Sequence, residues 1–183
     1  MSKENILNFI EELQDKTGED LNVCYQCKKC SAGCPIAYAM DYTPAQLMEA
    51  IRLGRRNLVL SSKTIWLCAS CETCTTRCPQ EIDISGVMDA LRILARKEKV
   101  KPAIPEVSLF YDYVLASVRL FGCIYELAVG AFVKLKTKEV LKETPLSLEL
   151  LKRKRLKIIP PFRDVFTINK IFKNIKRIER DLP

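Results

Sequence analysis

Residues 1–100 carry apolar side chains at helical spacing, and no segment among them alternates convincingly between apolar and polar residues as a half-buried strand does. The first helical segment, residues 4–16, places Ile6, Ile10 and Leu13 on one face, and Gly18 follows as its end. The pattern therefore predicts a mainly α fold for this part of the chain.

Two further helices are predicted from apolar stripes with recognisable ends. Thr43 is suited to the N-cap position, with Pro44 as the first helical residue, and Gly54 would end this helix. A later helix would be capped by Asp83 or Ser85. Its apolar stripe consists of Val87, Met88, Leu91, Leu94 and Ala95. Both helices belong to one predicted domain, residues 1–100.

Two prolines within residues 101–105 mark a domain boundary. Residues 101–183 are predicted to form a separate, helical extension. Residues 107–135 are strongly apolar, but charged residues interrupt them every seven positions, at Asp112, Arg119 and Glu126. A membrane-spanning helix needs about 20 predominantly apolar residues. We therefore expect an amphipathic helix that packs on a protein surface, and no transmembrane segment.

The end of the chain combines apolar and basic residues. A short helix is expected from Thr144 and Pro145, a basic run follows at residues 152–157, and Pro160–Pro161 breaks the chain. The last predicted helix has an apolar stripe, with lysines and arginines mostly on its other faces. The stripe comprises Ile168, Ile171, Phe172, Ile175, Ile178 and Leu182.

The net charge of the chain lies entirely in this extension. Residues 1–100 contain 13 basic and 13 acidic residues, whereas residues 101–183 contain 17 and 9, which accounts for the whole +8. Few aromatic residues are interleaved with the basic ones. This favours a solvated face, or a dock for an acidic partner protein, over nucleic-acid binding. We expect subunit docking and no nucleic-acid partner.

Eight of the nine cysteines form one motif that occurs twice, with the copies 44 positions apart. Each copy has three cysteines separated by two residues, then a fourth after three residues, followed by proline. The first copy consists of Cys24, Cys27, Cys30 and Cys34, and the second of Cys68, Cys71, Cys74 and Cys78. This is the bacterial ligand run for a pair of [4Fe–4S] clusters, so two such clusters are predicted.

The fourth cysteine of each run is expected to serve the other cluster. Cysteines three apart on a tight, roughly helical loop can reach three iron corners, and the last corner points away. Each proline biases the preceding cysteine towards an extended backbone, which projects it away from the turn. The predicted ligand sets are Cys24, Cys27, Cys30 and Cys78 for one cluster, and Cys68, Cys71, Cys74 and Cys34 for the other.

Two zinc sites of four cysteines each are the main alternative, because C-x2-C pairs also bind zinc. Zinc sites usually consist of two separated pairs, whereas here a three-cysteine run with a Cys-Pro ending occurs twice. A disulfide framework is less consistent, since residues 1–10 are charged and their apolar run is too short for a signal peptide. Thiols that remain available as metal ligands suit a reducing cytosol, so we expect a cytoplasmic protein.

The remaining composition argues against a catalytic site. The six glycines form neither a G-x-G-x-x-G motif nor a P-loop, and the chain contains no histidine. Flavin, nicotinamide and nucleotide triphosphate fingerprints, histidine acid–base catalysis and Rieske ligation are therefore excluded. The ninth cysteine, Cys123, is expected to be a small buried hydrophobe, and Trp66 a core anchor. We assign no catalytic residue and expect a carrier of single electrons.

Residues between and after the cysteine runs carry a family resemblance. They are Leu53–Gly54, Ile65–Trp66 and Ile82–Asp83–Ile84. Together with the runs and their 44-residue period, residues 20–97 resemble the α-helical ferredoxin domain, and in detail the C subunit of heterodisulfide reductase from methanogenic archaea. One departure is Lys28, at a position where such domains commonly have glycine.

The resemblance implies a role in reducing the mixed disulfide of coenzyme M and coenzyme B, the last step of methanogenesis. It implies two partners in a heterodisulfide reductase complex. The A subunit bears flavin and supplies electrons, and the B subunit holds the catalytic clusters in its CCG motifs. This chain has no adjacent cysteines, so we expect the relay and not the catalyst. Alternatives are a relay in another oxidoreductase, of succinate dehydrogenase or glycolate oxidase type, and a structural iron–sulfur or zinc adapter.

Overall fold

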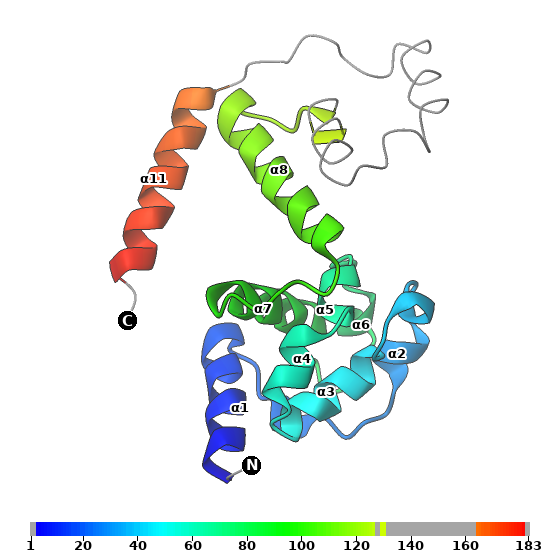
Figure 1. Cartoon of the computed structure of the whole chain (residues 1–183). Coiled ribbons are helices and arrows are strands. Elements are labelled where there is room, and N and C mark those ends of the chain that lie inside the picture. Colours follow the sequence, from blue (N-terminus) through cyan, green and yellow to red (C-terminus); the bar gives the residue numbers. More distant parts are fainter. Residues whose placement is uncertain (1–2, 127–128, 131–163, 182–183) are drawn as a thin grey trace, which may run out of the picture. The chain divides into compact units, whose positions relative to one another are not determined.

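A computed structural model describes residues 3–126, 129–130 and 164–181 of the chain (Figure 1). Within these residues the regular structure is helical and includes no strand, so the predicted mainly α fold is confirmed. Contacts divide the chain into two compact units, Met1–Pro105 and Glu106–Pro183. The short helix expected from Thr144, the basic run and Pro160–Pro161 lie outside the described residues.

The first unit is a bundle of short helices joined by tight loops (Figure 1). In chain order they are α1 (Lys3–Thr17), η1 (Leu21–Val23), α2 (Lys29–Ala32), η2 (Ala37–Ala39), α3 (Pro44–Arg52), α4 (Arg56–Ser61), α5 (Thr64–Leu67), α6 (Thr73–Thr76) and α7 (Ile84–Lys97). Helix α7 packs against α1, α4, α5 and α6, while α3 packs against α1, α2 and α4. The short helices α2 and α6 also contact each other.

The predicted ends of the two longer inner helices are confirmed. Helix α3 begins directly after Thr43, whose backbone N–H donates a hydrogen bond to the side-chain oxygen of Gln46 at 2.9 Å. Helix α7 begins after Asp83, whose carboxylate accepts a hydrogen bond from the backbone N–H of Gly86, also at 2.9 Å. Gly54 follows α3 with a φ of 65°, a conformation that glycine adopts without a steric penalty.

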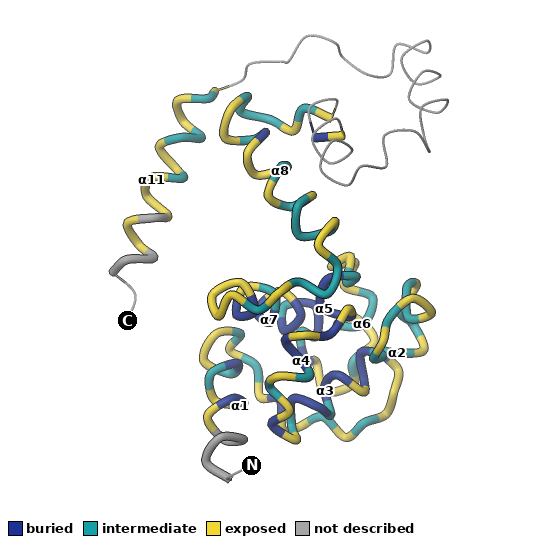
Figure 2. The backbone as a smooth tube through the Cα atoms, in the orientation of Figure 1, coloured by how far each residue is buried: buried dark blue, intermediate teal, exposed yellow. Residues whose placement is uncertain are grey.

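The core lies where the apolar faces of α1, α3, α4, α5 and α7 meet (Figure 2). Its largest fully buried side chains are Trp66, Phe9, Leu13, Leu21, Leu47, Met48, Ile51, Leu60, Ile65, Ile82, Met88 and Leu91. Trp66 is therefore a core residue, as expected. On α1 the buried face includes Phe9, which the spacing analysis missed, and the side chain of Ile6 lies outside the described ones.

Helices α4 and α5 were not predicted, because six and four residues are too few to display a helical stripe. An ionic cluster holds α4 in place. The guanidinium of Arg56 pairs with Glu12 of α1 at 2.8 Å and with Glu98 at the end of α7. It also lies 5.0 Å from the ring centroid of Phe9. Long-range contacts of this kind, and not local pattern, position the short helices.

The second unit contains two long described helices, α8 (Pro105–Phe121) and α11 (Val165–Asp181). The single helix expected over residues 107–135 was too long, since α8 ends where Gly122 adopts a φ of 74°. Helix α11 confirms the last predicted helix. Cys123 was expected to be buried, but the structure shows it only half-buried. No helix in the described part of the chain has the length and apolarity needed to cross a membrane.

Candidate metal centre

The two cysteine runs fold into loops with the same backbone conformation. In the first loop, Gln26 and Lys28 are left-handed, with φ of 60° and 63°. In the second loop, the residues 44 positions later, Ser70 and Glu72, have φ of 48° and 59°. Each loop then makes one helical turn, α2 or α6. The 44-residue repeat of the sequence is therefore also a repeat of backbone conformation.

This backbone is suited to bind an anionic group. Successive N–H groups of neighbouring left-handed and right-handed residues point into one concavity, an arrangement that occurs at many iron–sulfur sites. The left-handed conformation costs a non-glycine residue roughly 1–2 kcal/mol. This cost explains why glycine is common at the position of Lys28 in the domains that the chain resembles. Lys28 and Glu72 carry the same strain in the two loops, as residues of functional loops often do.

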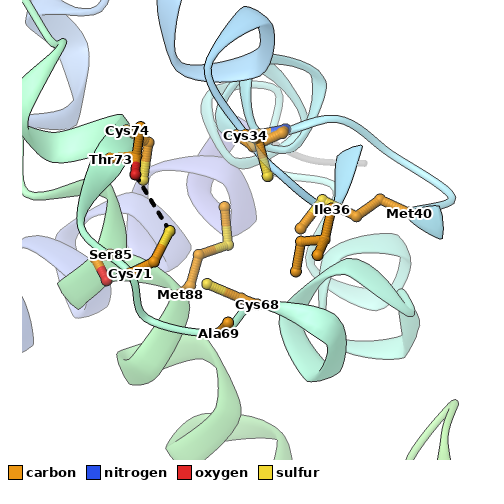
Figure 3. A pocket seen from close by; sticks show the side chains of 11 residues that line it. Cys34, Ile36, Met40, Cys68, Ala69, Cys71, Thr73, Cys74, Ser85 and Met88 are labelled. Carbon is orange, nitrogen blue, oxygen red and sulfur yellow. Dashed lines mark hydrogen bonds between the residues drawn. The ribbon is translucent and has the colours of Figure 1, made fainter. Parts of the chain in front are cut away.

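Cysteines from both runs line one cavity (Figure 3). Cys34 comes from the first run, whereas Cys68, Cys71 and Cys74 come from the second. The other lining residues are mostly apolar: Ile36, Met40, Pro44, Ala69, Thr73, Ser85 and Met88. The fourth cysteine of one run thus shares a cavity with the first three cysteines of the other.

Burial is the main influence on the pKa of two thiols of this cavity, Cys68 and Cys74. It raises the pKa of Cys74 to about 11, and the neighbouring Cys68 acts in the same direction. Burial also raises the pKa of Cys68, with a smaller contribution from Cys34. Hydrogen bonding to Thr73 instead lowers the pKa of Cys71, whose sulfur lies 3.4 Å from the threonine hydroxyl (Figure 3). A metal centre must displace the thiol protons, so its assembly is coupled to pH.

The first loop holds Cys24, Cys27 and Cys30. Burial raises the pKa of Cys30, and the two other thiols of the loop act in the same direction. Cys78, from the second run, belongs to this neighbourhood as well. Desolvation raises the pKa of the Tyr25 hydroxyl, and both Cys27 and Cys78 raise it further. Cys34 therefore lies at the loop of the second run, and Cys78 acts on Tyr25 in the first.

Hydroxyl side chains tie both ligand loops to the helices that follow them. Ser31, directly after Cys30, accepts a hydrogen bond from the backbone N–H of Ala45 in α3 at 2.9 Å. Thr75, directly after Cys74, accepts one from Ser85 in α7 at 3.2 Å. In each case the donor is the second residue of the helix. The sequence analysis missed this pair, although a hydroxyl residue directly after the third cysteine of both runs was a readable signal.

Asp41 is a further residue that the sequence analysis missed. Its carboxylate accepts hydrogen bonds from the backbone N–H groups of Lys63 at 2.8 Å and Thr64 at 3.0 Å, and from the Thr64 hydroxyl at 2.8 Å. Burial alone would raise the pKa of Asp41, but these hydrogen bonds outweigh it, so the pKa lies below its ordinary value. They fix the segment after Cys34 to the helix that leads into Cys68. No local signal exists, because the partners lie 22 residues apart.

The donor atoms of the site fit an iron–sulfur centre. All eight candidate ligands are thiols, and soft thiolate ligands suit iron–sulfur clusters and zinc. Within the described residues, no three Cys, Asp or Glu side chains converge as the ligands of a single metal ion would. Sulfur atoms instead approach one cavity from two separate loops, and its apolar walls would shield a bound cluster from water.

Comparison with known protein families agrees with this donor set. Residues 20–82 match the family of 4Fe-4S dicluster domains. This range contains all eight cysteines of the repeated motif. The chain therefore carries a 4Fe-4S dicluster domain, and its cofactors are two [4Fe–4S] clusters, as the motif predicted.

Known proteins similar to the chain share related names. The C subunit of the H(2):CoB-CoM heterodisulfide,ferredoxin reductase of Methanothermobacter marburgensis is 31% identical over 93 residues, which cover 51% of this chain and 48% of that protein. The iron-sulfur C subunit of the CoB–CoM heterodisulfide reductase of Methanopyrus kandleri is 35% identical over 99 residues, or 50% and 52% of the two chains. A protein of Archaeoglobus profundus, named as being like the C subunit of heterodisulfide reductase, is 32% identical over 106 residues, 56% of each.

The chain spans about half the length of the curated relatives it matches. Over that half, the expected resemblance to the C subunit of heterodisulfide reductase is confirmed.

Proposed function

We propose that this chain is the electron-relay subunit of a cytoplasmic heterodisulfide reductase complex. It would accept electrons from a flavin-bearing subunit and pass them to the catalytic subunit, which reduces the coenzyme M–coenzyme B disulfide in methanogenesis. The carrying observation is the cavity that thiols of both cysteine runs line together. The names of the similar proteins, which are subunits of such reductases, support the choice of reaction.

We propose crossed ligand sets for the two clusters. One set is Cys24, Cys27, Cys30 and Cys78, and the other is Cys68, Cys71, Cys74 and Cys34. The second set is supported by the shared cavity. The first set is supported by the joint influence of Cys27 and Cys78 on Tyr25. Crossing would tie the two halves of the domain together, so that neither loop could move without disturbing both clusters.

The residues around each site would hold and shield the carrier. A bound cluster supplies the capacity to take up and release one electron at a time. Ile36, Met40 and Met88 line the four-cysteine cavity and would shield a bound cluster from water. Backbone N–H groups of the ligand loops would favour the more negative, reduced state. Solvent exclusion and N–H groups are the protein's means of setting the reduction potential.

The second unit would supply the docking surface for the partner proteins of the complex. Helix α11 exposes Phe166, Ile171, Ile175 and Ile178, and the last three lie at helical spacing on one side. Lys170 and Arg177 lie beside this stripe along one of its edges, in the part of the chain that carries the whole net positive charge. An exposed apolar stripe with a basic border fits an apolar groove with an acidic rim on a partner protein.

Two substitutions on α11 separate the contributions of the stripe and the border. Ile171→Gln removes an apolar contact without changing charge, and it should weaken co-elution with the flavin-bearing and catalytic subunits at every salt concentration. Lys170→Gln removes a charge from the border, and it should weaken binding at low salt only, because salt screens exposed charges. Binding that both variants leave intact would contradict docking through α11.

A relay in a different oxidoreductase is the second candidate. One similar protein is named only as being like the C subunit, and the similarity covers about half of this chain. The second unit would then select another partner while the cluster domain kept its role. Identification of the proteins that co-purify with the native chain separates the two candidates. Clusters that cannot be reduced would instead indicate a structural adapter.

The crossed ligand sets are tested by replacing single cysteines. Cys34→Ser should disturb the cluster bound by Cys68, Cys71 and Cys74, and leave the other cluster intact. Cys123→Ser is the matched control, because it removes the one thiol outside the motif. Iron content and electron paramagnetic resonance (EPR) of the reduced, anaerobically purified protein are the measurements. Loss of the cluster bound by Cys24, Cys27 and Cys30 in Cys34→Ser would contradict the crossing.

The relay itself is tested by thiol release from the coenzyme M–coenzyme B disulfide. Dithionite-reduced protein should support turnover when the catalytic subunit is added, and none when it is alone. The reason is that the chain supplies thiols for cluster binding but no flavin motif and no histidine. Multiple turnover by this chain alone would contradict the relay and require a substrate site within it.

A further inference from the structure

The two ligand loops differ at one pair of equivalent positions that contact each other. Gly33 and Arg77 lie 44 residues apart, and their backbones agree closely, with φ/ψ of −95°/−6° and −93°/−4°. This conformation does not require glycine, because φ is negative. A β-carbon at residue 33, however, would lie 2.8 Å from both Cδ and Nη1 of Arg77. Glycine at position 33 therefore leaves the space that the arginine side chain fills, and a β-carbon there would displace that side chain.

Arg77 consequently lies at the junction of the two loops. Its backbone leads directly into Cys78, while its guanidinium lies against Gly33, the residue before Cys34. The helical turns that carry these residues, α2 and α6, contact each other. Cys34 and Cys78 are the two cysteines that the proposed ligand sets exchange. The charge of Arg77 thus lies close to a ligand of each cluster.

We propose that Arg77, accommodated by Gly33, stabilises the reduced states of both clusters and so tunes electron transfer between them. The inference rests on the proposed crossed ligand sets. A guanidinium stays charged at every pH at which the protein is folded. Each cluster gains one negative charge on reduction, and a positive charge close to a proposed ligand of each cluster attracts both. The positive charge stabilises the state with both clusters reduced most, because two reduced clusters also repel each other.

Four variants test this role in the full chain with both clusters assembled. Arg77→Gln should lower the midpoint potentials of both clusters, measured by stepwise anaerobic reduction followed by EPR. Gly33→Ala should shift both potentials in the same direction, although it removes no charge, because its β-carbon displaces the guanidinium. The double variant should match Arg77→Gln. Lys97→Gln removes the same charge at the far end of α7 and should leave both potentials unchanged.

Unchanged potentials in Arg77→Gln with full iron content would overturn the inference, as would a Gly33→Ala variant identical to the native protein. If Arg77→Gln fails to assemble its clusters, Gly33→Ala carries the same test, with Arg77→Lys expected to stay near the native potentials. A different result would contradict the proposed function. Native protein that passes no electrons to the catalytic subunit would refute the relay even where the potentials of the Arg77 variants shift as expected.

Discussion

Replacing Gly86 with alanine should destabilise the protein, although the same change stabilises most helices. Gly86 is the third residue of α7, and its N–H donates a hydrogen bond to the N-cap carboxylate of Asp83 at 2.9 Å. A β-carbon at residue 86 would overlap Oδ2 of that carboxylate and lie 3.0 Å from its Cγ. Asp83 would therefore have to leave its capping position.

The size of the effect follows from three contributions. Glycine to alanine inside a helix gains about 1 kcal/mol. Loss of the Asp83 cap costs about 1 kcal/mol. The Thr75 hydroxyl, which donates to Asp83 at 2.9 Å, loses its partner at a cost of about 1 kcal/mol. The expected net loss in the free energy of unfolding is about 1 kcal/mol. Since Thr75 follows Cys74, the ligand loop should also release iron faster.

Anaerobic urea unfolding of the cluster-loaded protein, followed by far-UV circular dichroism, measures this loss. The control is the same substitution in an Asp83→Ala background, where no carboxylate opposes the new methyl group. There Gly86→Ala should stabilise the protein by about 1 kcal/mol. The resulting double-mutant cycle isolates the clash between the two residues. Equal stabilisation in both backgrounds would refute the reasoning.

Three further outcomes can be measured by the same unfolding assay. Lys28→Gly should stabilise the first ligand loop by about 1 kcal/mol by relieving a left-handed backbone, whereas Lys29→Gly, within the helical turn, should destabilise it. Because the pKa of Asp41 is lowered on folding, its contribution is complete at neutral pH and is lost as the pH falls through the folded-state pKa. Asp41→Asn should therefore be less stable than the native chain at neutral pH, and the difference should vanish in acid. Arg56→Met should lose about 1 kcal/mol, and less at high salt, because it breaks a partly exposed ionic cluster.

The helices that the sequence predicted correctly are those whose information is local. Helix α3 has Thr43 and Pro44 at its start, α7 has Asp83, and α11 repeats its apolar residues over several turns. The shorter α4 and α5 offer no such repeat, and long-range partners hold them in place. The single helix expected beyond residue 107 was too long because Gly122 was not recognised as a helix end.

The candidate site likewise has features that local sequence predicted and features that depend on long-range contacts. The spacing of the cysteines predicted the two [4Fe–4S] clusters, because ligand runs of this kind are typical of such pairs. The residues that anchor those loops were not predictable. Asp41 contacts Lys63 and Thr64 across 22 and 23 residues, and Ser31 contacts Ala45 across 14. Such hydrogen bonds depend on how the helices pack, and a single sequence does not reveal that.

The contact between Gly33 and Arg77 shows why a repeat in the sequence does not determine the interface between its copies. The equivalent positions 33 and 77 of the two copies meet each other, because Gly33 lies against the side chain of Arg77. At such a place two arginines would compete for the same space and repel, whereas two glycines would leave a gap. One small and one large residue fill the space with a single charge. The departure from the repeat at this position is therefore a packing requirement, and its consequence is one positive charge close to a proposed ligand of each cluster.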